Sequence, residues 1–133
     1  MRDHLAKARH NEKFLKLIND SIKDDFFDWK ITISFYSGLH YLKAFLKLKR
    51  VYGGNTHTQI DNLINPSSTT KKVDIPEDIY GKYQELLNNS RNARYEAYQS
   101  SKFQIMLLEI KKDQSTKLLI ELKEYFRSQG LSI

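Results

Sequence analysis

Apolar residues recur along most of this chain at steps of three and four, which is the pattern of amphipathic helices. A first helix is predicted over residues 2–23, and Asp3 is its candidate N-cap. Because the apolar residues line one side only, this helix is expected to pack against the rest of the chain through a single face. That face carries Leu5, Ala8, Phe14, Leu15, Ile18 and Ile22.

The second predicted helix, residues 24–50, is the most apolar element of the chain. Two wide apolar stripes indicate that it is buried against more than one neighbour. Aspartates at its start and lysines at its end complement the helix dipole, and Gly53 and Gly54 then interrupt helical backbone. One stripe holds Trp29, Ile33, Tyr36, His40 and Ala44, and the adjacent one holds Phe35, Leu39, Leu42 and Leu46.

Two more helices are predicted in the middle of the chain. A short one over residues 56–65 has Thr56 as its candidate N-cap and a small apolar face. A long one over residues 75–98 carries Pro76 in its first turn, where a proline is tolerated because the missing N–H has no helical partner there.

The C-terminal third combines one clear helix with one ambiguous run. Leucines and aromatic residues at helical spacing predict a helix over residues 113–129 that ends at Gly130. The apolar run 103–112 fits either a buried helical turn or a strand. Together the elements predict an all-α, up-and-down bundle of four to five helices in a single domain, residues 1–133.

Composition supports this class. The chain of 133 residues is 40% apolar, enough for one core, and its five glycines and two prolines are too few for a β-sandwich with many turns. Cysteine is absent, which excludes disulfides and thiolate metal sites. We see no secretory signal and no apolar run of the roughly 20 residues that span a bilayer. A cytoplasmic protein that does not bind membranes is expected.

The charge balance favours a polyanionic partner. The chain has 22 basic and 16 acidic residues, a formal net charge of +6. Such an excess attracts phosphate-bearing ligands, so RNA or a nucleotide is the expected partner. Many soluble proteins carry a similar charge without any anionic ligand, and charge alone leaves both interpretations open.

Two histidines are candidates for chemistry. His40 sits in the middle of an apolar helix, where a hydrogen-bonded core residue and a catalytic residue both fit. The nearby Gly38 costs about 1 kcal/mol relative to alanine, which points to close approach by a neighbouring helix or by a ligand. His57 opens the short helix, whose positive end favours a neutral imidazole. The other interpretation of His57 is an exposed loop residue without a role. His4 and His10 are expected to be solvated, at a spacing unsuited to a metal site.

Two arginines in "NNSRNARYEAYQ" are candidates for phosphate binding. Arg91 and Arg94 are three residues apart, so they face the same way on a helix. Guanidinium groups are permanent cations whose donors match phosphate oxygens in pairs, and Tyr95 beside them can stack on a base. The other interpretation is a solvated pair bonded to acidic neighbours. Without a glycine-rich phosphate loop or a His-x-x-x-His pair, no metal and no cofactor are expected.

A resemblance to a known family rests on three segments, "FFDWKITISFYSGLHYLKAFL", "THTQIDNLI" and "IYGKYQELLNNSRNARY". They resemble the branch of the HEPN superfamily that has the patterns F-x-D-W-x-x-T-x-x-F-Y-x-x-x-H-Y and S-R-x-A-R-Y. The resemblance implies a bundle of four or five helices, a homodimer, and a link to RNA in toxin–antitoxin or defence systems. The matching residues are Asp28, Trp29, Thr32, Phe35, Tyr36, His40, Tyr41, His57, Ser90, Arg91, Ala93, Arg94 and Tyr95.

Nuclease members of this superfamily carry an arginine, a polar residue and, some residues later, a histidine. Arg91 and Asn92 match the start of that motif, but no histidine follows them. Many members are metal-independent ribonucleases and others only bind, so the resemblance leaves both activities open. If the chain is a nuclease, His40 and Arg91 are the candidate catalytic residues. Substrate binding is assigned to His57, Asn92, Arg94 and Tyr95.

The functional expectation is therefore an RNA- or nucleotide-binding protein, with an antitoxin or a nucleotidyltransferase as protein partner. The alternative is a non-catalytic, helical protein-interaction module in which His40 and Arg94 only satisfy polar groups of the core. The two differ in geometry, because a shared site requires His40, Arg91 and Arg94 to converge on an open cleft.

Overall fold

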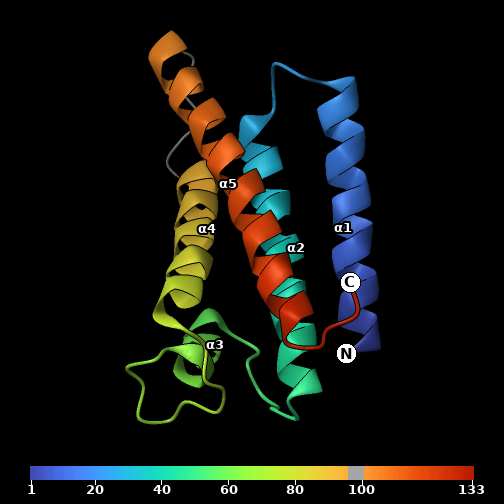
Figure 1. The fold of residues 1–133 in the computed structure, drawn as a ribbon. Helices are drawn as coiled ribbons and strands as arrows, with labels where there is room; N and C mark the ends of the chain where they lie inside the picture. The colour runs from blue at the N-terminus through green and yellow to red at the C-terminus, as the bar shows by residue number, and fades with distance from the viewer. Residues whose placement is uncertain (96–100) are drawn as a thin grey trace.

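The computed structural model describes residues 1–95 and 101–133. No strand occurs in these two ranges, so the run 103–112 is helical and the predicted all-α class is confirmed. The predicted helix over residues 75–98 is described as far as Tyr95. The five helices are α1 (Arg2–Ser21), α2 (Phe27–Leu48), α3 (His57–Ile64), α4 (Glu77–Tyr95) and α5 (Lys102–Ser128), shown in Figure 1.

Helix α2 lies at the centre of the bundle, and α1, α4 and α5 all pack against it. In Figure 1, α1 and α4 stand on opposite sides of α2, and α5 crosses in front of it. The four long helices alternate in direction, and the short α3 lies at the lower end of α4 (Figure 1). Three neighbours thus cover α2 on three sides, which leaves the fourth side for polar residues.

Capping residues and glycine determine where several of the helices begin and end. The Thr56 hydroxyl oxygen accepts a hydrogen bond from the N–H of Gln59 at 3.1 Å, so Thr56 is the N-cap of α3 as predicted. Asp3 does not cap α1, because the helix already begins at Arg2 and Asp3 lies in its first turn. There its carboxylate stabilises the positive end of the dipole. Gly130 follows α5 with φ at +105°, a conformation that glycine adopts without strain.

Helix α5 begins well before the predicted start at residue 113. Ser101 is its N-cap, since its Oγ accepts from the N–H of Gln104 at 3.3 Å. Phe103 and Met106 in the added turns are 63% and 51% exposed, whereas Leu108 is buried against Phe27 and Ile31, so this apolar run is a helix that buries only one side. Neither α5 nor any other helix of the described ranges is long and apolar enough to cross a membrane.

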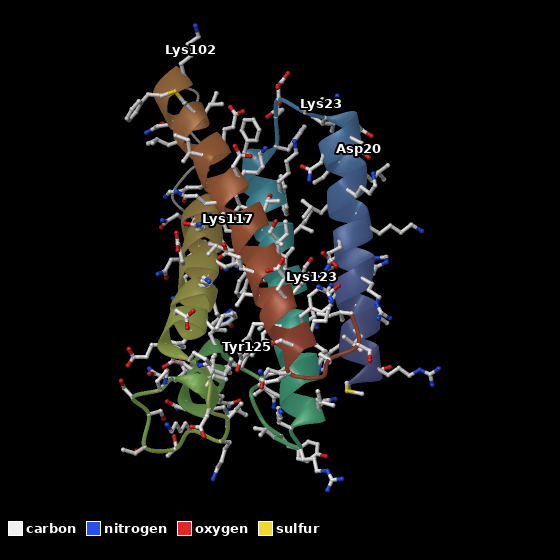
Figure 2. All side chains as sticks on the ribbon, viewed as in Figure 1. Asp20, Lys23, Lys102, Lys117, Lys123 and Tyr125 are labelled. Atoms are coloured by element: carbon white, nitrogen blue, oxygen red, sulfur yellow. The ribbon has the colours of Figure 1, made fainter. Side chains whose placement is uncertain are left out.

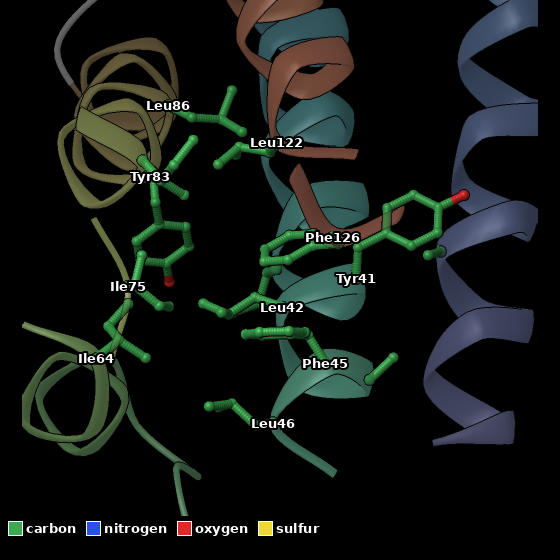
Figure 3. Close-up of a cluster of buried hydrophobic side chains, with 14 of the residues drawn as sticks. Tyr41, Leu42, Phe45, Leu46, Ile64, Ile75, Tyr83, Leu86, Leu122 and Phe126 are labelled. Carbon is green, nitrogen blue, oxygen red and sulfur yellow. The ribbon is translucent and has the colours of Figure 1, made fainter. Parts of the chain in front are cut away.

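The main core lies where α2 meets α4 and α5. Gly38 allows these helices to approach, because a Cβ there would lie 3.0 Å from Leu86 and 3.6 Å from Leu119. Two turns further along α2, the rings of Phe45 and Phe126 pack with centroids 5.0 Å apart (Figure 3). Of the two explanations for a mid-helix glycine, the structure shows close packing of neighbouring helices.

Polar contacts fasten α1 to this core. The Tyr41 hydroxyl on α2 donates to the Glu12 carboxylate on α1, which also accepts from Nζ of Lys123 on α5 at 2.9 Å. One carboxylate therefore joins three helices. The Lys30 ammonium, 1% exposed, donates to the carbonyl oxygen of Ile22 just beyond α1, where a cation offsets the negative end of the dipole.

The side of α2 opposite Gly38 carries polar, partly exposed residues. Tyr36 and His40 lie two residues before and after Gly38, a rotation of about 200° on a helix, so they point away from the α5 interface. The sequence grouped both with Trp29 in a packing stripe, but Trp29 is 58% exposed. We call this side the open stripe; it consists of Tyr36, His40 and Lys43, which are half-buried, and Lys47, which is exposed.

Candidate functional site

His57 is the first residue of α3, and the fold carries it to the edge of the open stripe. Its ring is half-buried and lies over Phe35, with centroids 5.7 Å apart. Burial lowers the pKa of His57, and the positive charges of Arg91, Arg94 and Lys43 lower it further. The imidazole is therefore neutral at neutral pH, which leaves it able to accept a proton or a hydrogen bond.

Arg94 reaches from α4 across to the open stripe. Its Nη1 donates to the Tyr36 hydroxyl oxygen at 2.9 Å, and its Nε donates to the Ser90 carbonyl at 3.3 Å. The guanidinium lies over the Tyr36 and Tyr95 rings, 5.5 Å and 5.1 Å from their centroids. A guanidinium has five N–H donors, and three of them form no hydrogen bond to another described residue.

Arg91 lies one turn earlier on α4 and is exposed. Its charge acts on two groups of the site, His57 and Tyr83. No ion pair within residues 1–95 and 101–133 involves Arg91 or Arg94. The structure therefore provides no evidence in these ranges for the interpretation that acidic neighbours neutralise the pair.

Several buried polar atoms lie close to these arginines. His57 Nδ1, the Tyr83 hydroxyl and Ser90 Oγ have no hydrogen-bond partner among the residues that the structure describes. Burial raises the pKa of Tyr83, so its hydroxyl stays protonated, and its ring packs 6.1 Å from that of Phe35. An unpaired buried polar atom costs free energy. In native structures, such an atom often belongs to a strained site or to a site that binds a ligand.

His40 is not part of this group. Its Nδ1 shares a hydrogen bond with Nδ1 of His4 at 3.1 Å, and the two rings stack with centroids 5.3 Å apart. Burial lowers the pKa of His40 to about 4, with further contributions from His4, Lys43 and Lys7. No arginine contributes to this shift. The structure thus brings His57 to the arginines and places His40 with His4, which is half-buried rather than solvated as expected.

The other predicted site residues flank the arginines on α4. Tyr95 is 78% exposed, and Asn92 is half-buried. Sequence reasoning did not assign Tyr36, Tyr83 or Lys43 to the site. Tyr36 and Lys43 lie one turn before and after His40, so the helical spacing around that histidine was the signal that could have found them.

The arrangement suits an anion. Two permanent cations, a neutral imidazole and two phenols from three helices supply hydrogen-bond donors and positive charge. Among the described residues, the charge of Asp61 acts on Tyr83, and no carboxylate forms an ion pair with either arginine. No group of three or more histidine, aspartate or glutamate side chains that could hold a metal ion occurs in the described part of the chain.

Comparisons with protein-family models, with curated proteins and with solved structures gave no match to this chain.

Proposed function

We propose that this chain binds RNA, or the phosphate groups of nucleotides, through Arg91, Arg94 and His57. The observation that carries the proposal is two guanidinium groups at the open stripe with no acidic partner among the described residues. Like charges held close together repel each other, so a phosphate between them stabilises the arrangement. The resemblance to the HEPN superfamily supports RNA as the ligand, in a toxin–antitoxin or defence system.

Each residue has a distinct role in this proposal. Arg94 is already oriented by Tyr36, so its free donors can bind a phosphate without losing much side-chain entropy. The exposed Arg91 supplies a second cation. The exposed ring of Tyr95 offers a surface on which a base stacks, a contact worth about 1–3 kcal/mol per base.

The same residues support cleavage of the bound strand without a metal. The neutral imidazole of His57 takes the proton of an RNA 2′-hydroxyl, and that oxygen attacks the adjacent phosphorus. The arginines stabilise the negative charge that builds up on the phosphorane oxygens. The 5′-oxygen of the next nucleotide then leaves and takes a proton from water.

The test uses labelled single-stranded RNA and purified protein in the presence of a chelator. We expect Arg91→Ala and Arg94→Ala each to weaken binding by about 10- to 100-fold, the effect of one charge-assisted hydrogen-bond donor. His57→Gln should bind RNA and fail to cut it. The matched control is Lys117→Ala, which removes one positive charge from an exposed position of α5 (Figure 2).

Each outcome has a definite meaning. RNA that stays intact, with binding lost in the arginine variants, makes the chain a binder without nuclease activity. Equal binding by the arginine variants and by Lys117→Ala contradicts the proposal. Absence of RNA binding favours the alternative function, a protein-interaction module.

A separate surface favours that alternative. A groove of about 360 Å³ between α1 and the start of α2 is lined by Phe14, Ile18, Ile22, Phe26 and Trp29. Phe14 and Trp29 are 50% and 58% exposed. Contiguous exposed apolar residues mark protein-binding surfaces. We propose this groove as the binding surface for the partner that the HEPN resemblance implies, a second copy, an antitoxin or a nucleotidyltransferase.

Analytical ultracentrifugation of the purified chain tests whether a second copy of the chain binds in this groove. The groove is supported as the interface if Trp29→Ser dissociates a dimer of this chain. Ile120→Ser, at an exposed position of α5, should leave that dimer intact. A wild-type monomer at high concentration excludes it.

A further inference from the structure

A second basic site lies at the far end of the open stripe from Arg94. It is a pocket of about 190 Å³ between the first turn of α1, the last turns of α2 and the glycine turn that follows α2. Its volume exceeds that of several water molecules, each of which occupies about 30 Å³ in the liquid, so a small polyatomic anion fits. The residues that line it include His4, Lys43, Lys47, Gly53, Gly54 and Asn55.

The pocket is positively charged. No carboxylate lines it, and neither Lys43 nor Lys47 takes part in an ion pair within the described ranges. His4, Lys43 and Lys47 line the same pocket. Burial lowers the pKa of His4, and the charges of Lys47, Lys43 and the N-terminal amine lower it further, against the opposing charge of Asp3. Two lysines beside a paired imidazole disfavour a metal cation and favour an anion.

The glycine turn adds backbone donors. Gly53 and Gly54 have φ angles of +101° and +82°, and neither N–H donates to a backbone carbonyl of another described residue. Successive turn N–H groups form concavities that bind anions. The turn is held in place by α3, since a Cβ on Gly54 would lie 3.1 Å from the Ile60 side chain.

The histidine pair orients His4 for the same ligand. Nδ1 of His4 is engaged by Nδ1 of His40, so only Nε2 of His4 remains for a molecule in the pocket. When the His40 Nδ1–H donates, His4 accepts at Nδ1 and carries its proton on Nε2. His4 then presents an N–H donor beside the two lysines.

We propose that this pocket binds a phosphate group, held by Lys43, Lys47, His4 and the glycine turn. As an extension that rests on the proposed function, the phosphate belongs to the RNA strand whose other contacts are at Arg91 and Arg94. Lys43 lies between the pocket and the arginine site, because its charge lowers the pKa of both His4 and His57. The open stripe from Tyr36 to Lys47 covers about 16 Å of helix, a length that spans several phosphates of one strand.

The pocket itself is tested with inorganic phosphate alone. We expect a titration at constant ionic strength, followed by amide NMR, to shift the Gly53, Gly54 and Asn55 signals. Lys47→Gln should abolish these shifts, and Lys117→Gln should leave them unchanged. Lys47 is exposed, so its replacement does not threaten the fold. Glycine-turn signals that do not respond to phosphate in the wild-type protein would overturn the inference.

The RNA extension is tested with the same variants. We expect Lys47→Gln to weaken RNA binding and to reduce the salt dependence of log K by about 0.7, the value for one phosphate contact on a single strand. If phosphate shifts the turn but RNA affinity is unchanged in Lys47→Gln, the pocket takes a free phosphate and the extension is wrong. Failure of the proposed function appears separately, as unchanged RNA affinity in Arg91→Ala, and does not affect the phosphate titration.

Discussion

The two sides of α2 show how differently one helix can use residues that are close in sequence. The side at Gly38 is sealed by leucines of α4 and α5, and its residues are fully buried. The open stripe begins two residues away and carries Tyr36, His40 and Lys43, none of which is fully buried. The sealed side is expected to determine the free energy of unfolding. The open stripe is expected to determine what the chain binds.

The largest effect is expected from the sealed side. Leu122 is 1% exposed and contacts the position of Gly38, so Leu122→Ala should lower the free energy of unfolding by about 2–5 kcal/mol. Ile120→Ala, on the same helix but 52% exposed, should change it by about 0.5 kcal/mol or less. Urea unfolding measures both. Equal losses would mean that the sealed side is not the stabilising one.

Two mid-helix glycines, Gly38 of α2 and Gly81 of α4, test whether close packing explains the glycine on the buried side of α2. Gly38→Val forces a side chain against Leu86, so overpacking should cost about 1–3 kcal/mol. At Gly81 of α4, a Cβ would meet no neighbouring side chain within 4 Å, so Gly81→Ala should stabilise by about 1 kcal/mol through helix propensity. Thermal unfolding should therefore shift in opposite directions for the two variants. A shift in the same direction would show that close packing does not explain Gly38.

A smaller effect is expected from pH on the open stripe. Burial and the charges of His4, Lys43 and Lys7 lower the pKa of His40 to about 4, below the ordinary value of 6.5. The unfolded chain therefore takes up a proton first, and stability is lost as pH falls from about 6.5 towards 4. Urea unfolding at several pH values should show this loss. His40→Gln should reduce it, whereas replacement of the exposed His10 should not.

The smallest effect on stability is expected at Tyr36. Tyr36→Phe removes the acceptor that orients Arg94 but keeps the ring, so unfolding should change by about 1 kcal/mol or less. RNA affinity should fall by about two- to tenfold, because Arg94 loses its preorganised position. A melting temperature that falls sharply, with RNA affinity unchanged, would place Tyr36 among the core residues instead.

Much of the fold was predictable because helices are encoded locally. Thr56 correctly predicted the start of α3, and the spacing of apolar residues correctly predicted the helix α2. The start of α5 was missed although Ser101 and Gln104 have the serine–glutamine spacing of a capping box. The apolar run 103–112 was expected to be buried. Apolar composition alone does not show how much of a helix is covered by neighbouring helices.

The candidate site was less predictable because it depends on where helices meet. The sequence placed Arg91 and Arg94 three residues apart on one helix, and the charges of both lower the pKa of His57. The pairing of His40 with His4 joins residues 36 positions apart, which no local pattern encodes. His57 comes under the charges of Arg91 and Arg94 because α3 lies at the end of α4, a placement that depends on the connection between α2 and α3.

The salt dependence of RNA binding is the most direct test of the central claim that Arg91 and Arg94 bind phosphate at the open stripe. The affinity of wild-type protein for a single-stranded RNA should be compared with that of an Arg91→Ala, Arg94→Ala double variant across a range of salt concentrations. We predict that the slope of log K against log salt becomes less steep by about 1.4 in the double variant, about 0.7 for each lost contact, and stays unchanged in Lys117→Ala. Equal slopes in the wild type and the double variant would contradict the account.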